Sequence, residues 1–317
     1  MKLQQLDAQS YAREVLPQTA GLWANGKDLE SYVAQWAEIA ESPYGKRHFR
    51  TMGFFDGNAL VASFKRYERA IQFGNARLRA FGIGAVFTPP ASRGRGYASA
   101  MLAMMLDESR RAGADLAYLF SDIHPQFYKG IGFVELPSRS ISIRADALDN
   151  GRIGVEVLAE RDWTAVRKCF DALASGSSWS FERSPIVWDW IRLGMRYAHV
   201  DGQPAHLILR RGRSVVAYVL GQREPAHDCY VVDEFGYADD AAAAEIPRLL
   251  RGAAGDLRRI TGWLPPQRAR ELLPRGSVRK RTGAILMAAA LSPKGDALVE
   301  QARVPSPSDP VWSTDHV

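Results

Sequence analysis

GIGAVFTPPASRGRGYASAML, residues 82–102, joins three structural signals in one run. Its apolar first part predicts a β-strand that ends at the double proline, because proline cannot donate a strand hydrogen bond. Beyond the turn, apolar side chains recur every three or four residues, which predicts a helix over 96–112. Arg93-Gly94-Arg95-Gly96 lies between the two. A glycine- and arginine-rich turn therefore connects a strand directly to the first turn of a helix.

This turn has the chemistry of an anion-binding site. A helix N-terminus offers free N–H groups and a partial positive charge, and glycine lets the main chain approach phosphate oxygens closely. Arginine adds charge-assisted donors. A flexible surface turn explains the same four residues when they are taken alone. Two other phosphate motifs are absent, since no GxxxxGK[ST] occurs and Ser99 stands where the third glycine of GxGxxG belongs.

The flanking sequence predicts an α+β domain. Two amphipathic helices, at 9–23 and 28–42, precede three strands that are separated by Gly-Asn turns. The helix at 96–112 is followed by a short buried strand at 116–120, a short helix and a strand at 140–144. The long helix then crosses between two neighbouring strands of a mixed, mostly antiparallel sheet flanked by helices.

A second motif, SDIHPQFYKGIGF at 121–133, follows the short buried strand. Together with 82–102, it resembles the GNAT superfamily of acyl-CoA-dependent N-acetyltransferases, over roughly residues 1–145. In that family the first motif binds the pyrophosphate and the second lies beside the acetyl-CoA sulfur. Two motifs in this order are more specific than either alone. The resemblance implies a transferase that moves an acetyl group from acetyl-CoA, as co-substrate, to a primary amine.

The resemblance also implies roles for matching positions. The main chain at Ala85, Val86 and Phe87 is expected to meet the pantetheine arm and the acetyl carbonyl. Tyr128 matches the tyrosine that donates a proton to the departing CoA thiolate, although a packed aromatic explains it structurally. Ser121 stands where the family often has an asparagine, and its hydroxyl is expected to bond the cofactor. The residues expected to hold the pyrophosphate are Arg93, Gly94, Arg95, Gly96, Tyr97 and Ala98.

The general base has no counterpart in the sequence. Many family members carry a glutamate on the strand before the phosphate loop, and 82–90 has none. Asp122, His124 and Glu68 are candidates, each of which a structural or solvated role explains as well. A terminal carboxylate is a further candidate if the tail beyond Pro305 folds back. The missing glutamate also keeps open a non-catalytic acyl-CoA-binding sensor or scaffold.

The second half repeats the order of predicted elements with a different sequence, and GAILMAAAL at 283–291 is expected to close its sheet. It has no Arg-x-x-Gly turn, and Asp239, Asp240 and Glu245 fall at the corresponding helix start, where they would repel pyrophosphate. This resembles the tandem GNAT arrangement of the enhanced-intracellular-survival (Eis) type, without its sterol-carrier domain. We therefore expect a catalytic acyl-CoA-binding domain at 1–150, a degenerate GNAT-like domain at 151–292 and an extended C-terminal tail at 293–317.

Two groups of residues in the second half are candidates for acceptor binding. Trp179, Trp188 and Trp190 could line a pocket for a bulky or cationic amine, although their spacing is also typical of core residues. Asp233 and Glu234 could bind a cation, or form salt bridges at the end of a strand. Small amines, polyamines, amino acids and peptide lysines all stay open as acceptors.

Composition narrows the classes of partner. The 317 residues are 46% hydrophobic and 24% charged, a normal balance for a globular chain of two domains. The net charge of +6 comes from scattered basic residues, so we do not expect nucleic acid as the main partner. Cys169 and Cys229 form no CxxC pair and the histidines show no ligand spacing, so we expect no metal. We also expect a cytoplasmic protein without membrane insertion, and a homo-oligomer stays open.

Overall fold

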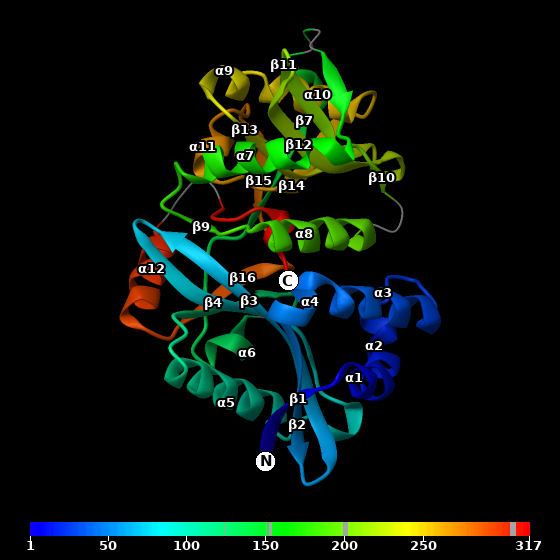
Figure 1. Ribbon diagram of the computed structural model, residues 1–317, viewed down its shortest axis with the longest axis vertical. Coiled ribbons are helices and arrows are strands. Elements are labelled where there is room, and N and C mark those ends of the chain that lie inside the picture. Colours follow the sequence, from blue (N-terminus) through cyan, green and yellow to red (C-terminus); the bar gives the residue numbers. More distant parts are fainter. Residues whose placement is uncertain (124, 150, 152–153, 199–201, 305–308) are drawn as a thin grey trace.

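Two mixed β-sheets of eight strands each lie one above the other along the long axis (Figure 1). The computed structural model describes residues 1–123, 125–149, 151, 154–198, 202–304 and 309–317. The first sheet has the order β1 (Lys2–Leu6), β2 (Phe49–Asp56), β3 (Ala59–Phe73), β4 (Ala76–Phe87), β5 (Leu116–Ser121), β16 (Ile285–Ala290) and β6 (Val134–Glu135), with β9 (Trp179–Phe181) paired to β3. The second has the order β15 (Ser277–Lys280), β7 (Arg139–Arg144), β14 (Arg259–Trp263), β13 (Cys229–Tyr237), β12 (Ser214–Glu224), β11 (Leu207–Arg211) and β8 (Val155–Val157), with β10 (Gln203–Pro204) paired to β12. The predicted α+β class with two tandem mixed sheets is confirmed.

Helices cover both faces of the first sheet. On one face lie α5 (Tyr97–Arg111), which buries its predicted stripe of Met101, Leu102, Met105 and Leu106, and α6 (Gln126–Lys129). On the other lie α1 (Ala8–Glu14), α2 (Leu16–Trp23), α3 (Leu29–Glu41), α4 (Pro43–His48) and α8 (Pro185–Ala198). The remaining helices are α7 (Trp163–Ala174), α9 (Asp240–Ala243), α10 (Ile246–Ala254) and α11 (Gln267–Arg270) in the second half, and α12 (Pro293–Arg303) beside β16.

Local sequence explains where the first helices begin and end. The Asp28 carboxylate accepts the Ser31 N–H at 2.7 Å and caps α3, as predicted. Pro43 follows α3 and occupies the first turn of α4, where its missing N–H costs no hydrogen bond. The helix predicted at 9–23 is divided into α1 and α2 at Val15.

The two halves of the chain exchange one strand each. β7, from the first half, pairs with β14 and β15 in the second sheet. β16 crosses in the opposite direction and lies between β5 and β6 of the first sheet. Both exchanged strands have neighbours on two sides, so each half supplies an interior strand to the other.

This exchange corrects two expectations from the sequence. The strand predicted at 140–144 belongs to the second sheet, and the segment at 283–291 forms β16 of the first sheet. Apolar periodicity reports burial, and it does not specify which sheet a buried strand joins. The tail is also not extended throughout, because 293–303 forms α12, whose first turn is capped by the Ser292 hydroxyl. Near both predicted domain boundaries, a strand therefore belongs to the sheet of the other half of the chain.

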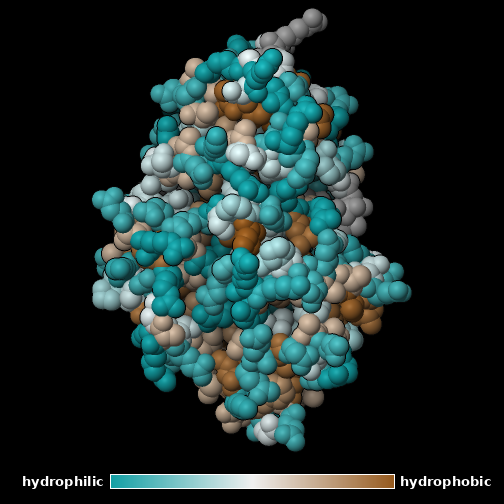
Figure 2. Space-filling model, in the orientation of Figure 1, coloured by the Kyte–Doolittle hydropathy of each residue, from teal (hydrophilic) through white to brown (hydrophobic). Residues whose placement is uncertain are grey.

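Most of the visible surface is hydrophilic. Figure 2 shows a mainly teal face on which brown atoms form small, separate groups. Within the described residues, none of the helices is long and apolar enough to cross a membrane. In the same part of the chain, no group of three or more histidine, cysteine, aspartate or glutamate side chains is arranged to hold a metal ion.

Candidate active site

The two central parallel strands of the first sheet separate partway along their length. β4 and β5 pair from Ala80–Leu116 to Ile83–Leu119, and β4 then continues to Phe87. Beyond Leu119, β5 keeps β16 as its partner as far as Ser121. A fork therefore opens at the carboxyl ends of β4 and β5, where ligands commonly bind in open sheets that contain parallel strands.

A β-bulge in β4 lies at this fork. The register between β3 and β4 shifts between the pairs Ser63–Phe87 and Lys65–Gly84. Ala85, inside the shift, has a φ of 48°, which is unusual for a residue with a Cβ. Bulges of this kind re-aim main-chain groups next to active sites. The bulge thus interrupts the regular ladder at Ala85 and Val86, directly before Phe87, and these are the three positions expected to meet the acyl group.

The predicted phosphate turn leads into α5 with a backbone that requires glycine. Gly94 and Gly96 have φ values of 75° and 76°, in the left-handed region that residues with a Cβ avoid. Nothing lies within 4 Å of a Cβ built at either position, so packing is not the reason for glycine here. Gly96 is the N-cap of α5 and has no side chain to cap the helix, which leaves its first-turn N–H groups to a ligand.

Side chains around the turn add positive charge and fix its position. Arg93 and Arg95 are exposed, and the Arg93 Nε donates to the Thr88 carbonyl at 3.1 Å. The Tyr97 hydroxyl donates to Asp56 Oδ2 at 3.1 Å, which ties the start of α5 to the end of β2. Ala98 follows in the first turn of the helix. The structure thus brings the predicted pyrophosphate residues together as one exposed turn.

Tyr128 lies on α6 and is 7% exposed. Its ring packs between Phe127 and Phe133, with ring centres 4.9 and 5.9 Å away, in the core beneath α5. Burial, reinforced by the charge of Asp122, raises the pKa of Tyr128 to about 12. The phenol therefore keeps its proton at neutral pH. The aromatic packing that the sequence offered as an alternative is present as well.

The other sequence candidates lie in different surroundings. Ser121 is buried at the end of β5, and its hydroxyl donates to the Ile123 carbonyl at 2.8 Å. Asp122 Oδ1 accepts the Ala284 N–H at 2.9 Å and so ties the end of β5 to the start of β16. Glu68 is ion-paired with Arg66 at 2.6 Å, and Arg66 reaches Ser109 near the far end of α5. His124 lies outside the described residues.

A cavity of about 620 Å³ lies between the two halves and is walled by α2, α3, α8 and the last residues of the chain. Val317 lines it and also lies against β4. Its main-chain oxygen is 3.3 Å from the position that a Cβ would occupy if Gly84 had one. A molecule in this cavity therefore sits beside the β4–β5 fork. The residues lining it are Trp23, Asn25, Gln35, Ile39, Asp122, Trp190, Ile191, Gly194, Met195, Tyr197, Asp233, Trp263, Ala284, Ser313, Thr314, His316 and Val317.

The structure separates the acceptor candidates of the second half. Trp190 lines the cavity and stacks on Tyr44 with ring centres 4.8 Å apart. Trp188 is fully buried in the second core, and Trp179 is buried between the sheets, so the core interpretation holds for these two. Asp233 lines the cavity, whereas Glu234 is completely buried in an ion pair.

His316 is a cavity residue that the sequence interpretation missed. Its ring lies 4.9 Å from Phe120 and 6.0 Å from Trp263, measured between ring centres. Burial lowers the pKa of His316, while Asp122 opposes the shift and Arg281 adds to it. A neutral imidazole therefore faces the cavity at neutral pH. A lone histidine in a proline- and serine-rich tail has no local signal that would have identified it.

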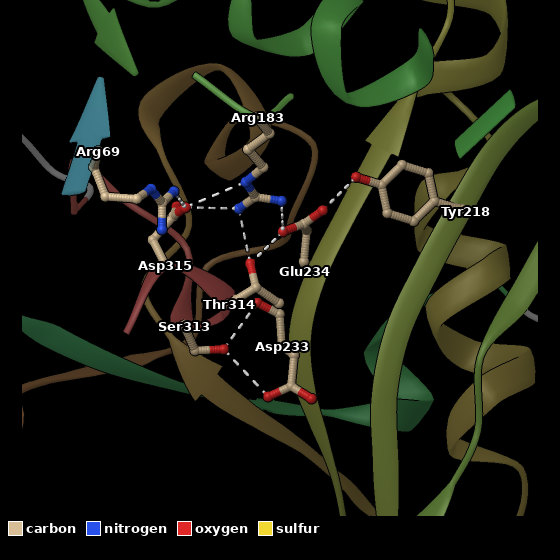
Figure 3. A network of polar contacts seen from close by, with 8 residues as sticks. All are labelled: Arg69, Arg183, Tyr218, Asp233, Glu234, Ser313, Thr314 and Asp315. Atoms are coloured by element: carbon tan, nitrogen blue, oxygen red, sulfur yellow. Dashed lines mark hydrogen bonds and ion pairs between the residues drawn. The ribbon is translucent and has the colours of Figure 1, made fainter. Parts of the chain in front are cut away.

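The last described residues are held by a buried polar network (Figure 3). Arg183 donates to Glu234 at 2.6 Å, to Thr314 at 2.8 Å and to Asp315 at 3.2 Å. Asp315 and Glu234 outweigh the effect of burial and raise the pKa of Arg183, so its charge is retained. Tyr218 adds a hydrogen bond to Glu234 at 2.5 Å. The network anchors the tail to β13 and, through Arg69, to β3.

The same tail fills a second fork. β13 and β14 pair only from Cys229–Arg259 to Val232–Gly262. Just beyond, the Ser313 hydroxyl donates to the Asp233 carbonyl at 3.0 Å, and the Asp309 N–H donates to the Leu264 carbonyl at 3.4 Å. The first sheet has its open fork next to a glycine-rich turn, and the second has its fork bridged by the chain itself. The position that is open in the first sheet is therefore occupied by the chain itself in the second.

Comparisons with known proteins bear on the fold. A model of the acetyltransferase (GNAT) domain matches residues 6–135. A GCN5-related N-acetyltransferase from Anabaena variabilis has 16% identity and a TM-score of 0.71, over 92% of this chain and 73% of that one. Eis1 from Mycobacterium abscessus has 13% identity and a TM-score of 0.62, over 92% and 74% of the two chains.

A third structure, N-myristoyltransferase from Saccharomyces cerevisiae with bound myristoyl-CoA, has 9% identity and a TM-score of 0.53, over 91% of this chain and 82% of that one. Identities this low show a shared fold. No curated protein sequence matches the chain. Residues 6–135 therefore match the GNAT acetyltransferase domain, and the chain as a whole shares its two-sheet fold with these structures.

Proposed function

We propose that the protein is an N-acetyltransferase that moves the acetyl group of acetyl-CoA to a primary amine. The observation that carries the proposal is the open β4–β5 fork beside the glycine-rich start of α5. The fork offers a place for the pantetheine arm, and the uncapped N–H groups after Gly96 offer a place for the pyrophosphate. Arg93 and Arg95 supply compensating charge.

The chemistry requires one bond to form and one to break. The amine nitrogen attacks the thioester carbon, a C–N bond forms, the C–S bond breaks, and the amine gives up a proton. The main-chain N–H groups of Val86 and Phe87, beside the bulge at Ala85, are the donors that we assign to the negative charge developing on the carbonyl oxygen.

Two protons must also move. The departing CoA thiolate takes a proton from the Tyr128 phenol, which is protonated at neutral pH and is replenished from solvent. We assign removal of the amine proton to His316, the neutral imidazole on the cavity wall next to the fork. The Ser121 hydroxyl, bonded to Ile123, can still accept a hydrogen bond from the donor.

A thiol-release assay tests the proposal. The full chain is mixed with acetyl-CoA and a panel of primary amines, and free CoA thiol and acetylated product are measured, while calorimetry measures acetyl-CoA binding. Amine-dependent thiol release with matching product supports the proposal. Acetyl-CoA binding without transfer to any amine replaces it with a sensor or scaffold, and no binding at sub-millimolar concentration overturns both. Myristoyl-CoA as a second donor tests acyl-chain preference.

A further inference from the structure

The cavity between the two halves has the charge of a cation site. Its described lining contains two side-chain carboxylates, Asp122 and Asp233, and neither lysine nor arginine. His316 adds no charge at neutral pH, because burial lowers its pKa. An ammonium group is attracted by two negative charges in such a partly desolvated space, and a carboxylate is repelled.

Described cations near the cavity contact partners outside its lining or on its rim. Arg281 lies 3.5 Å from the ring centre of Trp263 and is ion-paired with Asp309 at 3.3 Å. At the opposite wall, Arg196 is ion-paired with Glu38 at 2.6 Å. Lys27, 5.2 Å from the ring centre of Tyr197, donates to Gln35 at 2.7 Å. Among the described residues of the lining itself, the charged side chains, Asp122 and Asp233, are both acidic.

The rest of the wall is largely aromatic and aliphatic. Trp190 is fixed by stacking on Tyr44, and Trp263 packs against Phe120 with ring centres 5.3 Å apart. Trp23 meets Phe87 edge-on at 6.5 Å between ring centres, so the aromatic wall continues to the strand of the acyl site. The aliphatic part is made by Ile39, Ile191, Met195 and Val317. Such surfaces bind flat apolar groups and cations together.

We propose that the acceptor is a small organic cation with a primary amine on an apolar, aromatic body and without a carboxylate. The inference rests on the proposed transferase activity and specifies its substrate class. A volume of about 620 Å³ fits a small molecule. The position of Val317, shared between the cavity and Gly84, places the amine of such a molecule beside the β4–β5 fork.

Tryptamine, tryptophan and spermidine separate the alternatives. Tryptamine and tryptophan differ only in the carboxylate, and spermidine is a cation without an aromatic body. With acetyl-CoA as donor, we expect kcat/KM for tryptamine to exceed that for tryptophan by at least about 100-fold, because the carboxylate meets Asp122 and Asp233. We expect tryptamine to exceed spermidine by about 10-fold or more.

Variants test the wall directly. Asn at position 122 can still accept the Ala284 N–H, so Asp122→Asn should keep the fold while it raises the KM for tryptamine about 10-fold and leaves the KM for acetyl-CoA within about 2-fold. Trp190→Leu should raise the tryptamine KM as well. Asp107→Asn, on the exposed side of α5, is the matched control and should change neither constant.

The outcomes test the substrate class and the transferase activity separately. Transfer to tryptophan or spermidine as fast as to tryptamine, or an unchanged tryptamine KM in Asp122→Asn, overturns the substrate class and leaves the transferase activity standing. Acetyl-CoA binding without transfer to any of the three amines or to the wider panel overturns the activity itself, and the substrate class with it.

Discussion

Arg183 and Asp315 form a buried ion pair, with 3.0 Å between Nη2 and Oδ1, that holds the end of the chain between the two sheets. Arg69 of β3 reaches the same carboxylate at 3.2 Å, and Glu234 of β13 holds Arg183 at 2.6 Å. The four charges balance, so removal of one leaves another buried without compensation. The wall of the cavity therefore depends on residues from both halves.

Asp315→Asn should destabilise the protein by about 3–5 kcal/mol, because Arg69 and Arg183 then share only Glu234 as a counter-charge. Urea unfolding measures the change. Asp107→Asn removes a carboxylate from an exposed helical pair and should cost at most about 0.5 kcal/mol. A loss below about 1 kcal/mol in Asp315→Asn would show that the network does not hold the end of the chain against β3 and β13.

Gly96→Ala should weaken acetyl-CoA binding. A Cβ at a φ of 76° strains the N-cap by about 1 kcal/mol and projects into the open approach to α5. Gly57→Ala, in the β2–β3 turn, adds comparable strain at a φ of 57° and also has open space around it. Calorimetry should show weaker binding only for Gly96→Ala, and equal affinities of the two variants would remove the turn from the donor site.

Tyr128→Phe should reduce kcat about 100-fold, since the thiolate loses its proton donor, while the dissociation constant for acetyl-CoA changes less than about 3-fold. The ring packing against Phe127 and Phe133 is retained in the variant. Tyr230→Phe removes a buried hydroxyl in the second half and controls for general loss of packing. Equal losses in kcat and affinity would assign Tyr128 a packing role alone.

His316→Gln should lower kcat/KM and flatten its pH profile. In the unchanged protein, the imidazole of His316 protonates only below its usual pKa, so activity should be constant near neutral pH and fall on the acidic side. Asp122 and Arg281 act on the ring with opposite charges: Asp122 raises the pKa of His316, and Arg281 lowers it. The acidic pH at which activity falls moves in the same direction as this pKa. An acidic limb that is the same in both proteins would identify another base.

Lys65→Met should stabilise the protein at pH 7. Lys65 pairs with Gly84 across the strands, and burial lowers the pKa of its amine to about 8, against about 10.4 in an unfolded chain. Between these values the unfolded chain binds more protons, so stability from this site rises with pH. Below pH 8 the charged amine costs on the order of 3 kcal/mol. The variant recovers this cost, and the difference disappears above about pH 10.5.

Unfolding at pH 7 and pH 10.5 measures this difference. Lys46→Met, at a lysine that is exposed and ion-paired with Glu41, should change stability by less than about 0.5 kcal/mol at both pH values. A pH-independent gain in Lys65→Met would instead reflect added apolar contact.

Local signals in the sequence were sufficient to predict the strand, turn and helix that form the proposed donor site. The strand to Phe87, the turn at Gly94 and Gly96 and the helix after it are encoded within a few residues of one another, and each is where the sequence placed it. The carboxylate of Asp28 predicted the start of α3 for the same reason. Backbone conformation and capping are decided by near neighbours, so a single sequence reveals them.

The acceptor side depends on contacts that are distant in sequence. Asp122 and His316, or Val317 and Gly84, are brought together only by folding, and no spacing rule connects them. The destination of β16 was missed for the same reason, because an apolar strand fits either sheet. Ser292 followed by Pro293 is a start signal for α12 that the expectation of an extended tail overlooks.

The exchanged strands have a consequence for synthesis on the ribosome. A chain made from its N-terminus completes β5 long before β16 emerges, and until then one edge of β5 has no neighbour. The first half of the chain therefore cannot mature as a co-translational unit, although its match to the GNAT domain is already complete at residue 135. Expressed alone, residues 1–150 would expose that edge and tend to aggregate, so the shortest fragment worth producing must include β16.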